Sequence, residues 1–143
     1  MQSEVKTGAA DGRQWYAMKV YFNRVQPAID DAREAGLEFF APTGVIGNLL
    51  FVRCREEEVQ RFVAERWQRV WLYREMGSRR PAAIPDREME VFRFVVTAGR
   101  EGLTLLGDDR PEYHEGDRVV VTIRGVVAVA TTYIHPSLLR KAE

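Results

Sequence analysis

The sequence predicts an α+β fold in which helices pack on one mainly antiparallel four-stranded sheet. Residues 47–54 read Gly-Asn-Leu-Leu-Phe-Val-Arg-Cys, and a turn-like pair followed by an apolar run is typical of a buried strand. Glu56, Glu57 and Glu58 follow at once, and acidic residues stabilise the N-terminus of a helix. The whole chain then gives the order β-α-β-β-α-β-α, which favours helices layered on a sheet.

The segments before this central strand predict a tail, a strand and a helix. Residues 1–14 are polar, and we interpret them as a flexible tail. Residues 15–21 alternate well enough to form the first strand. We expect Asn23 to cap a helix with Pro27 in its first turn, and Gly36 to end it. The apolar stripe of this helix consists of Val25, Ile29 and Ala32.

The segments around and after the central strand complete the sheet and add two helices. Residues 37–43 predict the second strand and residues 70–74 the fourth. A helix is expected over 56–67, and a turn over 77–80. Asp86 follows a proline and is expected to cap a third helix. The buried faces of the last two helices are expected to hold Val59, Phe62 and Val63, and Met89, Phe92 and Val96.

The C-terminal part combines a polar stretch with a dense β segment. Residues 99–112 contain glycines and show no apolar periodicity, which favours a linker. Gly116 and Asp117 then precede a β segment over 119–134. The predicted organisation is a tail at 1–14, a domain at 15–98, a linker at 99–112 and a β segment at 113–143.

Composition indicates a globular cytoplasmic protein. Apolar residues make up 45% of the 143 residues, and 21 basic side chains balance 21 acidic ones. Without a basic excess, tight non-specific binding to nucleic acid is disfavoured. The single cysteine, Cys54, excludes an internal disulfide and suits a reducing compartment. The sequence has neither an apolar run of about 18 residues nor a secretory signal, so we expect no membrane association.

The chemistry-bearing residues do not form a pattern typical of an enzyme. His114 and His135 lie far apart with no cysteine near either, whereas a metal site needs clustered ligands. Cys54 ends an apolar run, and a buried free cysteine is the common outcome there. The glutamates at 56–58 are most simply a solvated helix start. We therefore expect no catalytic activity, no metal and no cofactor.

Two features suggest binding to a partner. The predicted strands are rich in aromatic residues, and because strand side chains alternate between faces, about half of them must pack in the core. Aromatic residues on an uncovered face would form a docking patch. The second feature is Arg79–Arg80 in the predicted turn, which is usually only solvated charge. The strand aromatics are Trp15, Tyr16, Tyr21, Phe51, Trp71 and Tyr73.

Several stretches together resemble the NusG family of transcription elongation factors, which includes the RfaH and UpxY-type paralogues. Trp15-Tyr16, Phe40-Ala41-Pro42 and Asn48-Leu49-Leu50-Phe51-Val52 are similar to the N-terminal domain of this family. Pro81-Ala82-Ala83-Ile84-Pro85 matches the same domain. Gly116-Asp117-Arg118-Val119 and residues 126–136 resemble the small KOW barrel that follows it.

The resemblance implies a regulator of transcription elongation and antitermination, in UpxY-type members on operons for surface polysaccharides. Its implied partner is bacterial RNA polymerase, contacted at the clamp helices, with nontemplate DNA nearby in the elongation complex. A further factor would bind the KOW part. Carried over by position, the implied polymerase-binding residues are Lys19, Ile46, Leu49, Phe51 and Arg69.

Two departures from this family predict additional residues in the chain. Relatives have a longer hairpin loop before the central strand, where Thr43 here meets Gly44 directly. A KOW barrel needs about five strands and about 50 residues, but only 27 residues follow Gly116. We therefore expect extra residues between Thr43 and Gly44 and near Arg118–Val119. Without them the KOW-type barrel is incomplete.

Two other functions compete with polymerase binding. An RNA-binding sheet would stack bases on Tyr16 and Phe51, although the central strand lacks the glycine of the usual RNA-binding signature. A small α+β enzyme is disfavoured by the missing catalytic pattern. If the family analogy holds, Leu49 and Phe51 share the exposed docking face, and Leu50 and Val52 pack under the helices.

Overall fold

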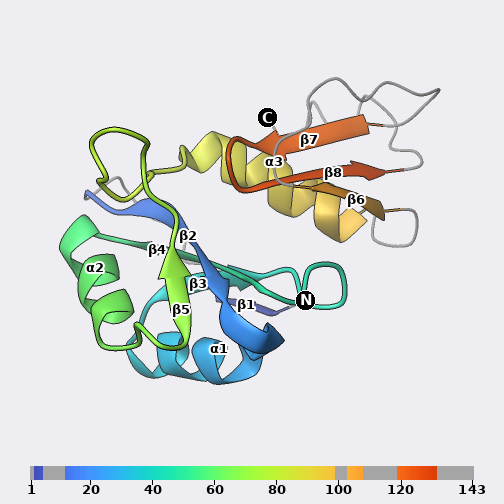
Figure 1. Ribbon diagram of the computed structural model, residues 1–143. Helices are drawn as coiled ribbons and strands as arrows, with labels where there is room; N and C mark the ends of the chain where they lie inside the picture. Colours follow the sequence, from blue (N-terminus) through green and yellow to red (C-terminus); the bar gives the residue numbers. More distant parts are fainter. Residues whose placement is uncertain (1, 5–11, 99–102, 108–118, 132–143) are drawn as a thin grey trace. The chain divides into compact units, whose positions relative to one another are not determined.

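The computed structural model is an α+β protein and describes residues 2–4, 12–98, 103–107 and 119–131 (Figure 1). The chain divides into two compact units, Met1–Ile84 and Pro85–Glu143. In the described part of the chain, none of the helices is both long enough and apolar enough to cross a membrane.

The first unit is built on a five-stranded antiparallel sheet. Its strands are β1 (Gln2–Glu4), β2 (Gln14–Val20), β3 (Glu38–Ala41), β4 (Leu49–Cys54) and β5 (Val70–Leu72). Their order across the sheet is β1-β3-β4-β2-β5, and all neighbours are antiparallel. The predicted apolar stretch is therefore the central strand, β4, and the four predicted strands are confirmed.

Two helices, α1 (Val25–Glu34) and α2 (Glu56–Ala64), cover one face of this sheet (Figure 1). Leu50 and Val52 of β4 belong to the core beneath them, which confirms the predicted alternation of faces. The predicted helix stripes are confirmed as well. The helix side chains in this core are Ala28, Ile29, Ala32, Val59, Phe62 and Val63, with Val25 packed against it.

Of the three predicted features at the ends of α1 and α2, two are confirmed and one is wrong. Gly36 has φ 74° just after α1, a conformation that glycine tolerates best, so the predicted stop is confirmed. The prediction that Asn23 caps α1 is wrong, because Asn23 lies in the 3₁₀ segment Tyr21–Asn23 and Arg24 occupies the cap position. The acidic start of α2 is confirmed, since the Glu58 side chain accepts a 3.0 Å hydrogen bond from the Arg55 backbone N–H.

Three further expectations about the first unit are wrong. Residues 1–14 are not all a tail, because β1 pairs with β3 and Gln14 begins β2. Helix α2 ends at Ala64 rather than at residue 67, because the backbone then turns toward β5, with Val70 N–H donating to the Arg66 carbonyl at 3.0 Å.

The third expectation concerned additional residues between Thr43 and Gly44. The two residues instead belong to a closed turn, in which the backbone N–H groups of Val45 and Ile46 donate to the Pro42 carbonyl at 3.1 and 2.9 Å. Gly44 has φ 89°, which a glycine accommodates readily. The turn therefore joins β3 to β4 without further residues. The second expected position begins at Arg118, which lies outside the described residues.

The second unit contains one helix and a three-stranded antiparallel sheet among its described residues. The elements are α3 (Asp86–Ala98), β6 (Leu103–Gly107), β7 (Val119–Ile123) and β8 (Val127–Thr131), with strand order β6-β8-β7. The third helix and the β segment are confirmed over their described residues, but the prediction that Asp86 caps the helix is wrong, because Asp86 is the first residue of α3. The prediction that residues 99–112 form a linker is wrong for Leu103–Gly107, because these residues form β6, which pairs with β8. A complete KOW barrel stays a prediction.

Candidate docking face of the sheet

The first unit's sheet has a second face, opposite the face covered by α1 and α2. Because strand side chains alternate and direct cross-strand partners share a face, the strand register defines its members. We call this set the second face. Its members are Trp15, Ala17 and Lys19 on β2, Glu38 and Phe40 on β3, Leu49, Phe51 and Arg53 on β4, and Trp71 on β5.

Three residues form one row across this face. Lys19 of β2 lies directly opposite Leu49 of β4 and directly opposite Trp71 of the edge strand β5. Leu49 is buried, Lys19 is exposed, and Trp71 is 47% exposed. Trp71 also makes an edge-on contact with Tyr73, with ring centroids 4.8 Å apart. The row therefore begins with the buried Leu49 on β4 and continues through the exposed Lys19 on β2 to the exposed Trp71 on β5.

The apolar residues that the sequence placed on a docking face are buried. Ile46 is 5% exposed, Leu49 3% and Phe51 0%. The Phe51 ring packs on Phe40, with centroids 6.4 Å apart. The expectation that Leu49 and Phe51 are exposed in the free protein is therefore wrong, although their placement on one face is confirmed.

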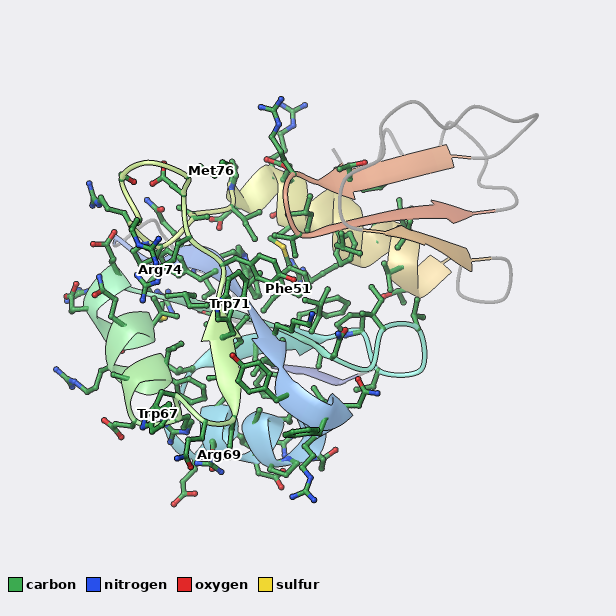
Figure 2. All side chains as sticks on the ribbon, viewed as in Figure 1. Phe51, Trp67, Arg69, Trp71, Arg74 and Met76 are labelled. Carbon is green, nitrogen blue, oxygen red and sulfur yellow. The ribbon has the colours of Figure 1, made fainter. Side chains whose placement is uncertain are left out.

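Arg69 lies apart from the other predicted polymerase-binding residues. Its Nη2 is 3.4 Å from Oδ2 of Asp31, a residue of α1, so its side chain extends toward the helical layer and not toward Lys19. Figure 2 shows Arg69 close to the helices, with Trp71 above it on β5. The structure thus brings Lys19, Leu49 and Phe51 together and leaves Arg69 outside their surface.

A buried ion pair on the second face was not predicted from the sequence. Glu38 and Arg53 are direct cross-strand partners, and Oε1 of Glu38 lies 3.3 Å from Nη1 of Arg53. Their side chains are only 1% and 6% exposed, and Arg13 also donates to Glu38. The single signal in the sequence is a glutamate inside a predicted apolar strand, which an exposed strand edge would explain equally well.

The structure excludes the stacking of RNA bases on Tyr16 and Phe51. Tyr16 belongs to the core under the helices, whereas Phe51 lies on the second face, and both are at most 3% exposed. Burial raises the pKa of the Tyr16 hydroxyl above its usual 10. Because the two rings point to opposite sides of the sheet, they are not a joint platform for bases.

Cys54 is a buried free cysteine, as expected. Burial, followed by the nearby carboxylates of Glu58 and Glu57, raises its pKa from 9.0 to about 12. The thiol is therefore neutral at pH 7, and a neutral thiol is a poor nucleophile. In the described segments, no group of three or more His, Cys, Asp or Glu side chains is arranged to hold a metal ion.

The most exposed large apolar residues are mostly outside the strands. Phe22 is 89% exposed, Trp67 69% and Met76 99%, compared with 47% for Trp71. Figure 2 shows Met76 on the loop beyond Arg74 and Trp67 near α2. None of these three lies in a predicted strand, so the alternation of strand side chains does not identify them. Neighbouring Gly77 and the 3₁₀ segment are the local signals that side chains there leave the regular faces.

The arginine pair predicted in the turn is partly engaged. Arg80 Nη2 lies 3.0 Å from Oε1 of Glu56 at the start of α2. The loop itself is closed by the Glu75 backbone N–H, which donates to the Arg80 carbonyl at 2.8 Å. Arg80 therefore links this loop to α2, so its side chain is not solely a solvent-exposed charge.

Comparison with protein-family models, with curated proteins and with solved structures gives no match. The row of Leu49, Lys19 and Trp71 has the features of a binding surface, because an apolar centre meets an exposed aromatic and a cation.

Proposed function

We propose that this protein is a transcription elongation and antitermination regulator that binds bacterial RNA polymerase at the clamp helices. The proposal rests on the resemblance of its sequence to the NusG family and is supported by the α+β order around β4. Contact with nontemplate DNA, and with a further factor through the KOW-like segment, belongs to the same proposal.

One observation carries the proposal: the exposed pair of Lys19 and Trp71 continues the buried Leu49 across a single row of the second face. Tryptophan is among the residues that contribute most to binding at protein interfaces. A neighbouring cation steers an acidic partner and fixes its orientation. Such a row suits docking of a helical partner along the β2–β5 edge.

The burial of Leu49 and Phe51 changes the contact that the resemblance implied. The proposed first contact is made by Trp71 and Lys19, which solvent already reaches. Leu49 lies beside Lys19 in the same row, and Leu49 and Phe51 are buried side chains that help to hold β4 against β2. Arg69 is assigned no polymerase contact, because its side chain pairs with Asp31 on the helical side.

The proposal is tested by mixing the purified chain with core RNA polymerase and separating free from bound protein by size-exclusion chromatography. We expect the chain to elute with the polymerase and to increase the fraction of long transcripts past a pause site. A chain that elutes alone at micromolar concentrations, and leaves pausing unchanged, would contradict the proposal.

RNA binding without polymerase contact is the second candidate function, and the same pair favours it. An exposed indole next to an ammonium group is also suited to stacking and charge contacts with single-stranded RNA. Titration with a short single-stranded RNA separates the two functions. Strong, salt-sensitive binding in the absence of polymerase would favour the RNA-binding module.

A further inference from the structure

The helical side of the first unit contains a cavity that the proposed function does not use. Its volume is about 610 Å³, within the range of about 300–1,000 Å³ that is common for small-molecule sites. Its lining residues come from the 3₁₀ segment, from α1 and from the turn that leads into β5. The side chains that matter are Phe22, Arg24, Asp31, Arg66 and Arg69.

The charged residues of this cavity leave an excess of positive charge. Among the lining residues, Arg24, Arg66 and Arg69 are balanced by Asp31, and Glu65 beyond the lining lies 3.9 Å from Arg66, so three cations and two anions give a formal charge of about +1. Oδ2 of Asp31 lies 2.9 Å from Nε of Arg66 and 3.4 Å from Nη2 of Arg69. One carboxylate oxygen is thus shared by two arginines, and the third arginine is not neutralised by it.

The three arginines differ in how firmly they are held. Arg66 is fixed, because its Nη1 donates to the Phe62 carbonyl at 3.1 Å and its guanidinium lies 4.0 Å above the centroid of the Phe62 ring. Arg69 is exposed and makes one long contact with Asp31. Among the described residues, Arg24 has no side-chain hydrogen bond or ion pair. Arg24 and Arg69 are therefore the groups with donors left for a ligand.

The start of α1 adds to the attraction for an anion at this cavity. Arg24 is its cap residue, no side chain caps the helix, and its first turn contains no acidic residue. The positive end of the helix dipole favours negative charge at this position. This contribution is small and only supplements the arginines.

An aromatic ring lies at the edge of the same cavity. Phe22 is 89% exposed and has φ 58° and ψ 26°, a left-handed conformation that is uncommon for a bulky residue. Such conformations cost free energy and tend to persist where a side chain is held for binding. An exposed phenylalanine beside guanidinium groups is a suitable surface for a planar base.

We propose that this cavity binds a nucleoside 5′-phosphate, with the phosphate between Arg24 and Arg69 and the base against Phe22. Planar guanidinium groups bind phosphate oxygens in pairs, and Arg24 and Arg69 are the two arginines here with donors left for such an anion. The same chemistry is offered by a free mononucleotide and by the 5′-phosphorylated end of an RNA. The site is independent of the second face, so it stands whether or not polymerase binding is confirmed.

The ligand class is tested by isothermal titration of the full chain with AMP, with a 5′-phosphorylated RNA tetranucleotide, and with the same RNA bearing a 5′-hydroxyl. We expect saturable binding of AMP, and at least about tenfold weaker binding of the hydroxyl RNA than of the phosphorylated RNA if the end of an RNA is the source. Binding of AMP alone identifies the free nucleotide as the source. Equal affinity for both RNAs, or no saturable binding of any probe, overturns the proposal.

Variants locate the binding site on the chain. Arg24→Ala is expected to weaken AMP binding about tenfold, with Arg24→Lys in between because a point charge replaces the paired donors. Phe22→Leu keeps apolar bulk but removes the ring, and we expect a loss of about five- to tenfold. The matched control is Arg61→Ala on the exposed side of α2, away from the cavity lining, which should leave the affinity unchanged.

Two further measurements separate binding from folding. Arg24→Ala should leave the thermal midpoint unchanged, because Arg24 has no side-chain partner among the described residues. AMP affinity should rise between about pH 5 and pH 7.5 as the phosphate becomes a dianion with a second pKa of about 6. Unaltered AMP affinity in both Arg24→Ala and Phe22→Leu overturns the assignment of the site.

Discussion

Lys19 of β2 and Trp71 of β5 are direct cross-strand partners at the edge of the first unit's sheet. Both are exposed, while Leu49 on the other side of Lys19 is buried. The pair is therefore the part of the second face that solvent reaches. Because β5 is an edge strand, the pair lies at the margin of the sheet, where a partner can approach it from the side.

The buried pair of Glu38 and Arg53 predicts a large loss of stability when one member is removed. We expect Glu38→Ala to lower the free energy of unfolding by about 3–5 kcal/mol, because the buried Arg53 guanidinium loses its carboxylate partner. Urea denaturation followed by circular dichroism measures this change.

The control for this prediction is Glu65→Ala, since Glu65 is 60% exposed and lies 3.9 Å from Arg66. That surface pair should contribute no more than about 1 kcal/mol. The double variant Glu38→Met/Arg53→Met should be more stable than Glu38→Ala, because neither charge remains buried. If Glu38→Ala and Glu65→Ala have equal effects, the buried pair does not exist in solution.

Substitutions on both faces of β4 are predicted to destabilise the first unit. Leu50 is 0% exposed under the helices and Leu49 is 3% exposed on the second face. An aspartate at either position buries an unpaired carboxylate, and we expect a loss of at least about 2–5 kcal/mol, the usual cost of Leu→Ala alone. Differential scanning calorimetry decides the point. A Leu49→Asp variant with an unchanged thermal midpoint would show that this face is open in solution.

The sequence predicted the elements that have a strong internal pattern. The apolar run of β4 and the stripes of α1 and α2 were recognisable because their periodicity alone identifies them. Strands β1 and β6 were missed, because each is short and is defined by its pairing with β3 or β8. Local sequence carries little information about such distant partners.

The candidate site was predicted only in part, for a similar reason. Alternation of side chains placed Leu49 and Phe51 on one face correctly, but it does not show that both faces of β4 are buried. The position of Arg69 in the sequence suggested a contact with the polymerase, whereas the distant Asp31 determines where its side chain lies. The exposed Trp71 became identifiable as a contact residue only once β5 was placed at the edge of the sheet.

The raised pKa of Cys54 predicts reduced stability in alkali. The folded thiol ionises near pH 12 and the unfolded thiol near 9.0, so the native state keeps a proton that the unfolded state loses. The stabilisation is complete below about pH 9 and is lost as the pH rises toward about 12. Urea unfolding at about pH 8 and pH 10 should show a smaller decrease for Cys54→Ala than for the parent chain.

Ionisation of Tyr16 also reduces stability, but at higher pH, because the pKa of its hydroxyl is raised above 10.0 in the folded protein. Tyr16→Phe therefore serves as the control, and its stability should still decrease between about pH 8 and pH 10. The native thiol should also react slowly with a disulfide reagent until urea unfolds the chain. Fast reaction of the folded protein would contradict the burial of Cys54.

The central claim is docking to RNA polymerase through the edge formed by Lys19 and Trp71. Its most direct test is the equilibrium affinity for immobilised core polymerase, measured by biolayer interferometry for the parent chain and three variants. Trp71→Ala and Lys19→Glu remove the aromatic and reverse the charge of the pair. Trp67→Ala is the matched control, because Trp67 is 69% exposed but follows α2 rather than lying on the second face.

Loss of a central tryptophan typically costs 2 kcal/mol or more, so we expect Trp71→Ala to weaken binding at least about tenfold. Lys19→Glu should mainly slow association and reduce its dependence on salt. Trp67→Ala should stay within about twofold of the parent chain, since each tenfold change needs about 1.4 kcal/mol. Polymerase affinity that is the same for Trp71→Ala as for Trp67→Ala, or no measurable binding by the parent chain, would contradict the account.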